Sequence, residues 1–155
     1  MTTLAGGREV RLAAHGGLRW TFFAAWHGET PVANVCAWDA DGAEIVGHVY
    51  TRPEWRGLGL AGALFVLHRR VSEQRGIRFS QLNTDAGSFQ EAFYRRHGYE
   101  PVPGVPGAMF RGEWPADDRL YAEPFEWSHW PRLNARALRQ GGRSLEGPML
   151  EEMFG

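Results

Sequence analysis

Two glycines stand where a helix is expected to begin, in the segment Arg56-Gly57-Leu58-Gly59-Leu60-Ala61. Glycine there costs backbone entropy, so its presence needs a reason. A helix N-terminus carries unbonded backbone N–H groups and the positive end of the helix dipole, and it therefore favours an anion, most often a phosphate. Glycine lets such a ligand approach the backbone closely. The segment therefore predicts a site for a phosphate-bearing molecule.

Two common phosphate-binding motifs do not fit this segment. No Gly-Lys-Ser/Thr follows the glycines, which excludes a Walker A loop. The third glycine and the βαβ opening of a dinucleotide-binding fold are also missing. What remains is an R-x-x-G-x-A pattern, which is too short to identify a ligand without its context.

The surrounding elements give that context. Residues 8–52 alternate apolar and polar residues between turn signals, which predicts four consecutive strands. A helix should follow Gly59 and bury a stripe of apolar residues, then a fifth strand over 77–83, a helix from a Ser88–Glu91 capping box to His97, and a last strand within 104–114. The expected stripe consists of Leu60, Leu64, Leu67 and Val71.

Composition limits the class of protein. The 155 residues are 43% apolar and 23% charged, with a net charge of −1, which is typical of one globular domain with no general attraction to nucleic acid. No apolar run is long enough to span a membrane, and the N-terminus does not resemble a signal peptide, so we expect a cytoplasmic protein. The single cysteine, Cys36, lies in an apolar strand and is expected to be a buried thiol.

Two segments together resemble one known family. They are Thr51 to Ala61, containing TRPEWRGLGLA, and Phe93 to Tyr99, containing FYRRHGY. This pair is similar to the two signature motifs of the GNAT superfamily, the Gcn5-related N-acetyltransferases. The resemblance implies an α+β fold with a mixed, mainly antiparallel sheet flanked by helices. It also implies acetyl-CoA as cosubstrate. The composition shifts from Arg111 onward, so we expect residues 1–110 to form the binding domain and 111–155 an extension packed on it or on a second subunit.

The resemblance also implies roles for particular residues. The pyrophosphate of CoA would lie on the backbone amides of 57–61, and the pantetheine arm would bond to the strand before the loop. Tyr94 would be the general acid that protonates the departing thiolate. The implied cofactor-binding residues are Val49, Tyr50, Thr51, Arg56, Gly57, Leu58, Gly59, Leu60 and Ala61.

The general base is not settled by the motif. The positions that relatives use fall on Ile45 and Gly47, neither of which can accept a proton. Glu44 and His48 are each one residue away, and a β-bulge would bring His48 round to the site. Histidine titrates nearest neutral pH, which suits the task. A water relay, Glu126 or His129 remain alternatives, and no His/Cys spacing suggests a metal.

The acceptor side departs from the family. Relatives usually insert two helices between the first two strands, whereas only His-Gly-Gly separates them here. The aromatic-rich segment 111–140, with Trp114, Trp127 and Trp130, is expected to cover the acceptor site, in its own chain or in a homodimer; the alternative is a helix on the far face of the sheet. We expect an N-acetyltransferase acting on a primary amine of a small molecule or peptide. The alternative is a CoA-binding module without catalysis, and a nucleic-acid-borne amine is disfavoured by the charge.

Overall fold

The computed structural model describes residues 1–16, 20–40 and 42–114. Alternating apolar residues between glycine turns produce a sheet, and two amphipathic segments produce helices. The helices are α1 (Leu60–Gln74) and α2 (Phe89–Arg96), and a 3₁₀ turn, η1 (Pro53–Trp55), precedes α1. The strands are β1 (Thr2–Ala5), β2 (Arg8–Gly16), β3 (Trp20–His27), β4 (Thr30–Ala40), β5 (Ala43–Thr51), β6 (Phe79–Asn83), β7 (Glu100–Pro101) and β8 (Ala108–Gly112).

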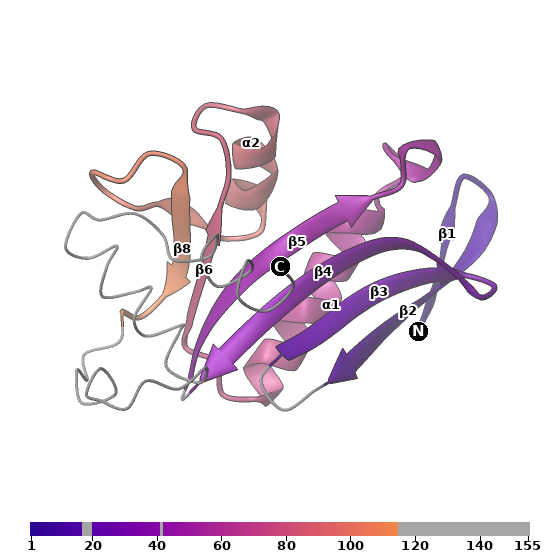
Figure 1. The fold of residues 1–155 in the computed structure, drawn as a ribbon, viewed down its shortest axis with the longest axis horizontal. Helices are drawn as coiled ribbons and strands as arrows, with labels where there is room; N and C mark the ends of the chain where they lie inside the picture. The colour runs from indigo at the N-terminus through magenta and orange to yellow at the C-terminus, as the bar shows by residue number, and fades with distance from the viewer. Residues whose placement is uncertain (17–19, 41, 115–155) are drawn as a thin grey trace, which may run out of the picture.

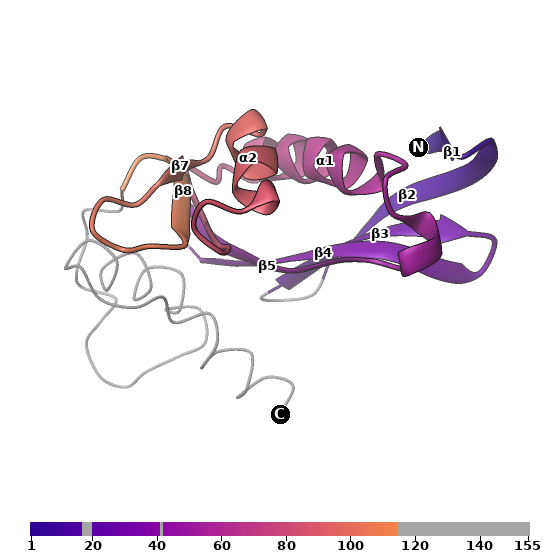
Figure 2. The same cartoon turned by 90° about the horizontal axis from the view of Figure 1, so that it is seen from above.

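The eight strands form one sheet in the order β1-β2-β3-β4-β5-β6-β8-β7 (Figure 1). Every neighbouring pair is antiparallel except β5 and β6, which are parallel and are connected through α1. Both helices lie on the same face of the sheet (Figure 2). The predicted mixed, mainly antiparallel sheet is confirmed, and the described residues from β1 to β5 contain strands and turns without a helix.

The predicted meander began one strand too late. Residues 2–5 form β1, which pairs with β2 from Thr2↔Arg11 to Ala5↔Arg8. The two strands are joined by Gly6 and Gly7, both at positive φ, which is the geometry of a tight hairpin turn. The pair of glycines was the available signal for this hairpin.

The main core lies between the sheet and α1, and its helical stripe differs from the prediction. Leu60 and Leu64 are buried as expected, but the stripe continues through His68 and Ser72, which are 0% and 4% exposed. The expected Leu67 and Val71 are only partly buried beside the core. Periodicity favoured the leucines because it counts His and Ser as solvent-facing. Their burial depends on a partner from another strand, described below.

The second helix begins at its expected cap. The Ser88 side chain accepts a hydrogen bond from the Glu91 backbone N–H at 3.3 Å. The Glu91 carboxylate accepts from the Gly87 N–H, one residue before the position that a full capping box uses. Neither α1 nor α2 is long and apolar enough to cross a membrane, and these are the α-helices of the described part of the chain.

The parallel pair β5–β6 is only partly joined. Its register runs from Ala43↔Phe79 to Ile45↔Gln81 and stops there. Beyond that point β5 continues alongside β4 and β6 continues alongside β8, so the two strands separate (Figure 1). We call the paired part the closed end and the separated part the open end.

Candidate active site

The open end exposes one backbone edge of β5. Tyr50 and Thr51 pair with Asn34 and Ala33 of β4 on one side. On the other side, no described strand pairs with β5 after Ile45. Unpaired N–H and C=O groups of such an edge can bond to an extended ligand as an additional strand would. No described strand therefore occupies this side of the segment assigned to pantetheine.

The loop after β5 leads to a helix start without a side-chain cap. Gly57 and Gly59 have φ of +74° and +83°, and Gly59 is the N-cap of α1. In the described part of the chain, the N-cap makes no side-chain hydrogen bond, and the first intrahelical bond runs from Ala63 N to the Gly59 oxygen at 3.0 Å. The amides from Leu60 to Gly62 therefore precede the hydrogen-bonded part of the helix, where an anion is favoured.

The two glycines also have a conformational reason. Positive φ disfavours residues with a Cβ, so the turn itself requires glycine at these positions. Among the described residues, none has a heavy atom within 4 Å of a Cβ added at Gly57 or Gly59. The space in front of the helix is thus open, which suits a ligand, while the glycines are explained by the turn.

The loop is anchored on both sides. Trp55 is 4% exposed, with the Arg8 guanidinium 3.5 Å from its ring centroid and the His27 ring at 5.0 Å. Arg56 Nε donates to the Thr51 carbonyl oxygen at 2.9 Å, which folds this side chain back on the end of β5. Leu58 packs against the core. The helix start is therefore held at a fixed place relative to the open edge.

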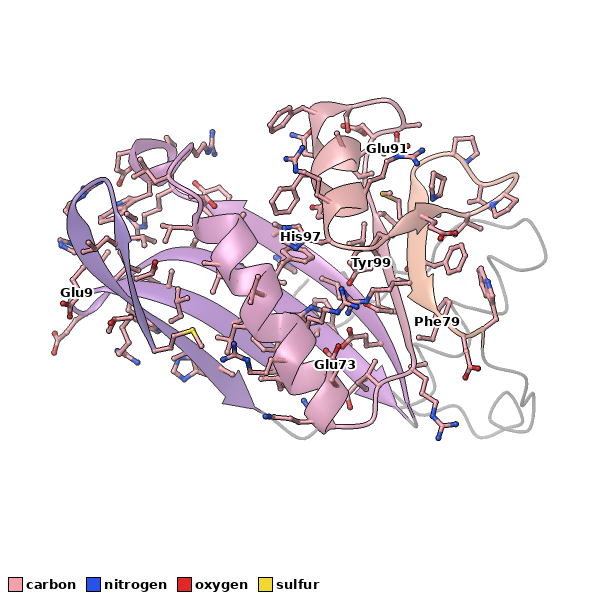
Figure 3. All side chains as sticks on the ribbon, turned by 180° about the vertical axis from the view of Figure 1, so that it is seen from behind. Glu9, Glu73, Phe79, Glu91, His97 and Tyr99 are labelled. Atoms are coloured by element: carbon pink, nitrogen blue, oxygen red, sulfur yellow. The ribbon has the colours of Figure 1, made fainter. Side chains whose placement is uncertain are left out.

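Tyr94 comes from the last turn of α2 and belongs to an aromatic group beside α1. It is 7% exposed, and its ring centroid lies 5.5 Å from that of Phe65, 5.4 Å from Phe93 and 6.4 Å from Tyr99. His97, at the end of α2, lies between the two helices (Figure 3). Such packing fixes the direction of the phenol, as a general acid requires.

A β-bulge occurs at His48. Tyr50 pairs with Asn34 and Gly47 pairs with Cys36, so His48 and Val49 together oppose a single residue of β4. His48 has φ of +51°, the only positive value among the described non-glycine residues. Its carbonyl accepts from Asn34 Nδ2 at 2.6 Å. The β-bulge considered in the sequence analysis is therefore present in β5, at His48 itself.

The bulge turns His48 to the face of the sheet away from α1. Its ring is exposed and lies 6.1 Å from the Trp38 ring. Val35 and Ala37 belong to the core under α1, so the alternating Trp38 points to the opposite face. His48 is consequently accessible to a molecule that arrives from that face.

Glu44 faces α1 instead. It is 2% exposed, and its carboxylate lies 2.7 Å from His68 Nε2 and accepts from Ser72 Oγ at 3.2 Å. Burial opposes ionisation, but His68 and a hydrogen bond from Ser80 outweigh it and hold the pKa of Glu44 below its usual value. The structure therefore does not bring the two candidate bases together: Glu44 lies in a buried network and His48 on the exposed face.

The sequence did not reveal this buried network at the closed end. It continues from Ser80 to Tyr99, whose hydroxyls lie 2.7 Å apart, and burial raises the pKa of Tyr99. Glu44 and Ser80 are direct partners in the β5–β6 register. The signal for this network in the sequence was that polar residues, His68 and Ser72, continue the i, i+4 spacing of the buried Leu60 and Leu64.

The C-terminal candidates are described only in part. Trp114 packs on Phe79 and Phe110, with both centroid distances 4.9 Å, and so lies at the closed end. The other expected contributors lie outside the described residues: Glu126, Trp127, His129 and Trp130.

Two further expectations concern reactive groups. Cys36 is buried as expected, and burial raises the pKa of its thiol to about 12, which keeps it protonated near neutral pH. Within residues 1–16, 20–40 and 42–114, no group of three His, Cys, Asp or Glu side chains could hold a metal ion.

A mixed sheet that separates between two parallel strands, followed by an uncapped helix start, is the arrangement expected of an acetyl-CoA-binding transferase fold. Residues 19–101, more than half of the chain, match the family model described as the acetyltransferase (GNAT) domain. The chain belongs to this family. A comparison with curated proteins gave no match.

Solved structures share this fold. The PaiA N-acetyltransferase of Thermoplasma acidophilum, in complex with coenzyme A, has a TM-score of 0.56 and 18% identity, and the match covers 62% of each chain. The ribosomal-protein-S18-alanine N-acetyltransferase of Escherichia coli gives 0.54 and 18%, covering 69% of this chain and 77% of that one. A Bacillus subtilis acetyltransferase in complex with CoA gives 0.55 and 9%, covering 67% and 99%. The match thus spans less than two thirds of the PaiA enzyme.

Proposed function

We propose that this chain is an acetyl-CoA-dependent N-acetyltransferase that acts on a primary amine of a small molecule or peptide. One observation carries the proposal: the open edge of β5 leads, through an anchored loop, to the uncapped start of α1. A linear molecule with a pyrophosphate at one end and an extended amide arm at the other fits these two features. Family membership supports the same cosubstrate.

The residues present fit that cosubstrate. The amides of Gly57 to Ala61 would hold the pyrophosphate, with open space in front of them. Val49, Tyr50 and Thr51 would bond to the pantetheine arm through their backbone. Bound there, acetyl-CoA supplies a thioester, whose carbonyl carbon is open to attack by an amine. No metal is required for this chemistry.

The transfer makes one bond and breaks another. The amine nitrogen bonds to the acetyl carbon, the carbon–sulfur bond breaks, and its electron pair leaves with sulfur. Tyr94 would donate a proton to that sulfur, and the amine would lose its proton to a base. We assign His48, directly or through water, as this base because it is exposed on the face opposite α1, whereas the Glu44 carboxylate is already engaged by His68 and Ser72.

A non-catalytic CoA-binding module remains the second candidate. It rests on the positions Ile45 and Gly47, which cannot accept a proton. Both candidates share the cofactor site and differ only in turnover, so one experiment separates them.

To test this, the protein is incubated with acetyl-CoA and a panel of primary amines, both small molecules and peptides with free N-termini. The thiol of released CoA is then measured. Acetylation of a panel member, verified as a mass increase, is the expected result. Stabilisation by acetyl-CoA without any turnover would favour the non-catalytic module. Absence of binding by acetyl-CoA and CoA would contradict both candidates.

A further inference from the structure

A recess lies on the α1 side of the sheet, at the closed end of the β5–β6 pair. Its volume is about 190 Å³, enough for several water molecules. It is lined by the second half of α1, the start of β6 and the end of β8. In Figure 3, Glu73 of α1, Phe79 of β6 and Tyr99 lie on three sides of this region.

The charges around the recess are mostly positive. Arg69, Arg78 and Arg111 line it, against the single carboxylate of Glu73, which leaves an excess of two positive charges. Arg69 Nε is 3.2 Å from Glu73, and both side chains are more than half exposed. Among the described residues, no carboxylate lies within 4 Å of either other guanidinium. The recess therefore has more positive than negative charge in its lining, with the buried Glu44 carboxylate interacting with Arg111 from beneath.

One of these arginines is held in place. The Arg111 guanidinium lies 4.9 Å from the Tyr99 ring centroid, and its Nη1 donates to the His97 carbonyl oxygen at 3.3 Å. A side chain added at Gly98 would meet Arg111 Cδ at 3.3 Å and Arg69 Nη1 at 3.5 Å. The side chains of Arg69 and Arg111 therefore both lie next to Gly98. Two like charges held together favour an anion between or in front of them.

His97, which lies beside these arginines, is also affected by their positive charges. The pKa of His97 is lowered, first by burial and then by the positive charges of Arg96, Arg111 and Arg69. A field that disfavours a proton on an imidazole favours a negative charge nearby.

The floor of the recess keeps the buried carboxylate away from a ligand. Ser72 and Ser80 line it and are 4% and 2% exposed. Their hydroxyls bond to Glu44 and Tyr99, respectively. Glu44 lies beneath them and is itself 2% exposed. A ligand at the mouth would consequently meet the guanidinium groups first.

We propose that this recess binds a compact oxyanion, the carboxylate or phosphate group of a small ligand. It is separate from the proposed pyrophosphate site, because Arg69 follows the N-cap Gly59 by ten residues, or about 15 Å along the helix. Guanidinium groups suit both anions through charge-assisted hydrogen bonds. The inference does not depend on acetyl-CoA binding.

The test titrates the whole chain with inorganic phosphate and, separately, with acetate, at constant ionic strength against chloride. Backbone amide NMR signals of residues 77–80 and 112 are followed. Arg69→Gln and Arg78→Gln each remove one exposed cation. The matched control is Arg95→Gln, because Arg95 pairs with Glu91 in the same i,i+4 arrangement, with 56% exposure against 53% for Arg69.

We expect saturable signal changes at residues 77–80 and 112, at least about tenfold weaker in Arg69→Gln and Arg78→Gln and unaltered in Arg95→Gln. Saturation by phosphate alone would assign a phosphate group, saturation by acetate alone would assign a carboxylate, and saturation by both would assign a site that accepts either oxyanion. Absence of saturable change with both anions would overturn the proposal, as would changes that persist undiminished in Arg78→Gln. Signals of 57–61 report the cofactor site separately, so the two sites can fail independently.

Discussion

The two ends of the β5–β6 pair differ in how their backbone and side chains are satisfied. At the closed end, Ala43–Ile45 pairs with Phe79–Gln81, and Glu44 lies in a network that reaches α1 and Tyr99. At the open end, β5 has one backbone edge that no described strand pairs, a bulge at His48 and a helix start without a side-chain cap. The closed end is joined by strand pairing and buried side-chain hydrogen bonds, whereas the open end leaves one side of β5 without a described partner strand.

This difference explains why polar residues close in sequence have separate roles. Glu44 and His48 are four residues apart on one strand, but the bulge and the alternation of the strand place them on opposite faces. Substitutions at the closed end should therefore change stability, and substitutions at the open end should change binding or turnover.

The largest expected effect is on turnover. Tyr94→Phe keeps the ring packing and removes the hydroxyl that we assign as general acid. We expect kcat to fall by about 10²- to 10⁴-fold, with CoA affinity close to that of the parent. Steady-state thiol release and CoA titration measure the two quantities. Parent-like turnover in Tyr94→Phe would exclude the hydroxyl as the acid.

The second-largest expected effect is on the stability of the closed end. Glu44→Ala removes the buried partner of His68, and we expect a loss of about 3 kcal/mol in the free energy of unfolding, measured with denaturant. Glu73→Ala, which breaks the exposed pair with Arg69, is the control and should cost far less.

The pH dependence of the free energy of unfolding also tests whether Glu44 stabilises the closed end. Burial opposes the ionised form of Glu44, but the His68 partner prevails and lowers its pKa. On lowering the pH, the unfolded carboxylate therefore takes up a proton before the folded one does. The stabilisation is present above the ordinary carboxylate pKa of about 4.3 and is lost as the pH falls through the lower folded value. Glu44→Ala should lack this part of the decline, and an unchanged pH profile would contradict the assignment.

The smallest effect concerns the second tyrosine. Tyr99→Phe removes the hydrogen bond to Ser80, and we expect a loss of about 1 kcal/mol in stability with kcat close to the parent's. Chemical denaturation and thiol release are measured on the same preparation. A loss of turnover as large as in Tyr94→Phe would mean that the closed end takes part in catalysis.

The sequence predicted the parts that depend on local pattern. The four-strand meander, the start of α1 after Gly59 and the Ser88 cap of α2 follow from alternation, glycine and capping chemistry. The motifs predicted the family because they join a strand, a turn and a helix start at fixed spacing.

The features that were missed depend on contacts distant in sequence. His68 and Ser72 are buried because Glu44 lies beneath α1, which helical periodicity cannot show. The glycines at 57 and 59 were attributed to close approach of a phosphate, whereas their positive φ already requires glycine. A substitution at either glycine therefore strains the backbone as well as blocking a ligand. It tests ligand binding only when it is compared with a substitution elsewhere that introduces the same backbone strain.

Such a control exists for the central claim that CoA binds at the start of α1. Gly57 and Gly76 both have φ of +74°, and a Cβ at either would meet no atom of the described residues within 4 Å. Gly57→Val and Gly76→Val should therefore lose similar stability without ligand. Thermal unfolding with CoA should show stabilisation of about 2.7 kcal/mol at 100 times Kd in the parent and in Gly76→Val, and little in Gly57→Val. Equal stabilisation of both variants by CoA, or none in the parent, would contradict the account.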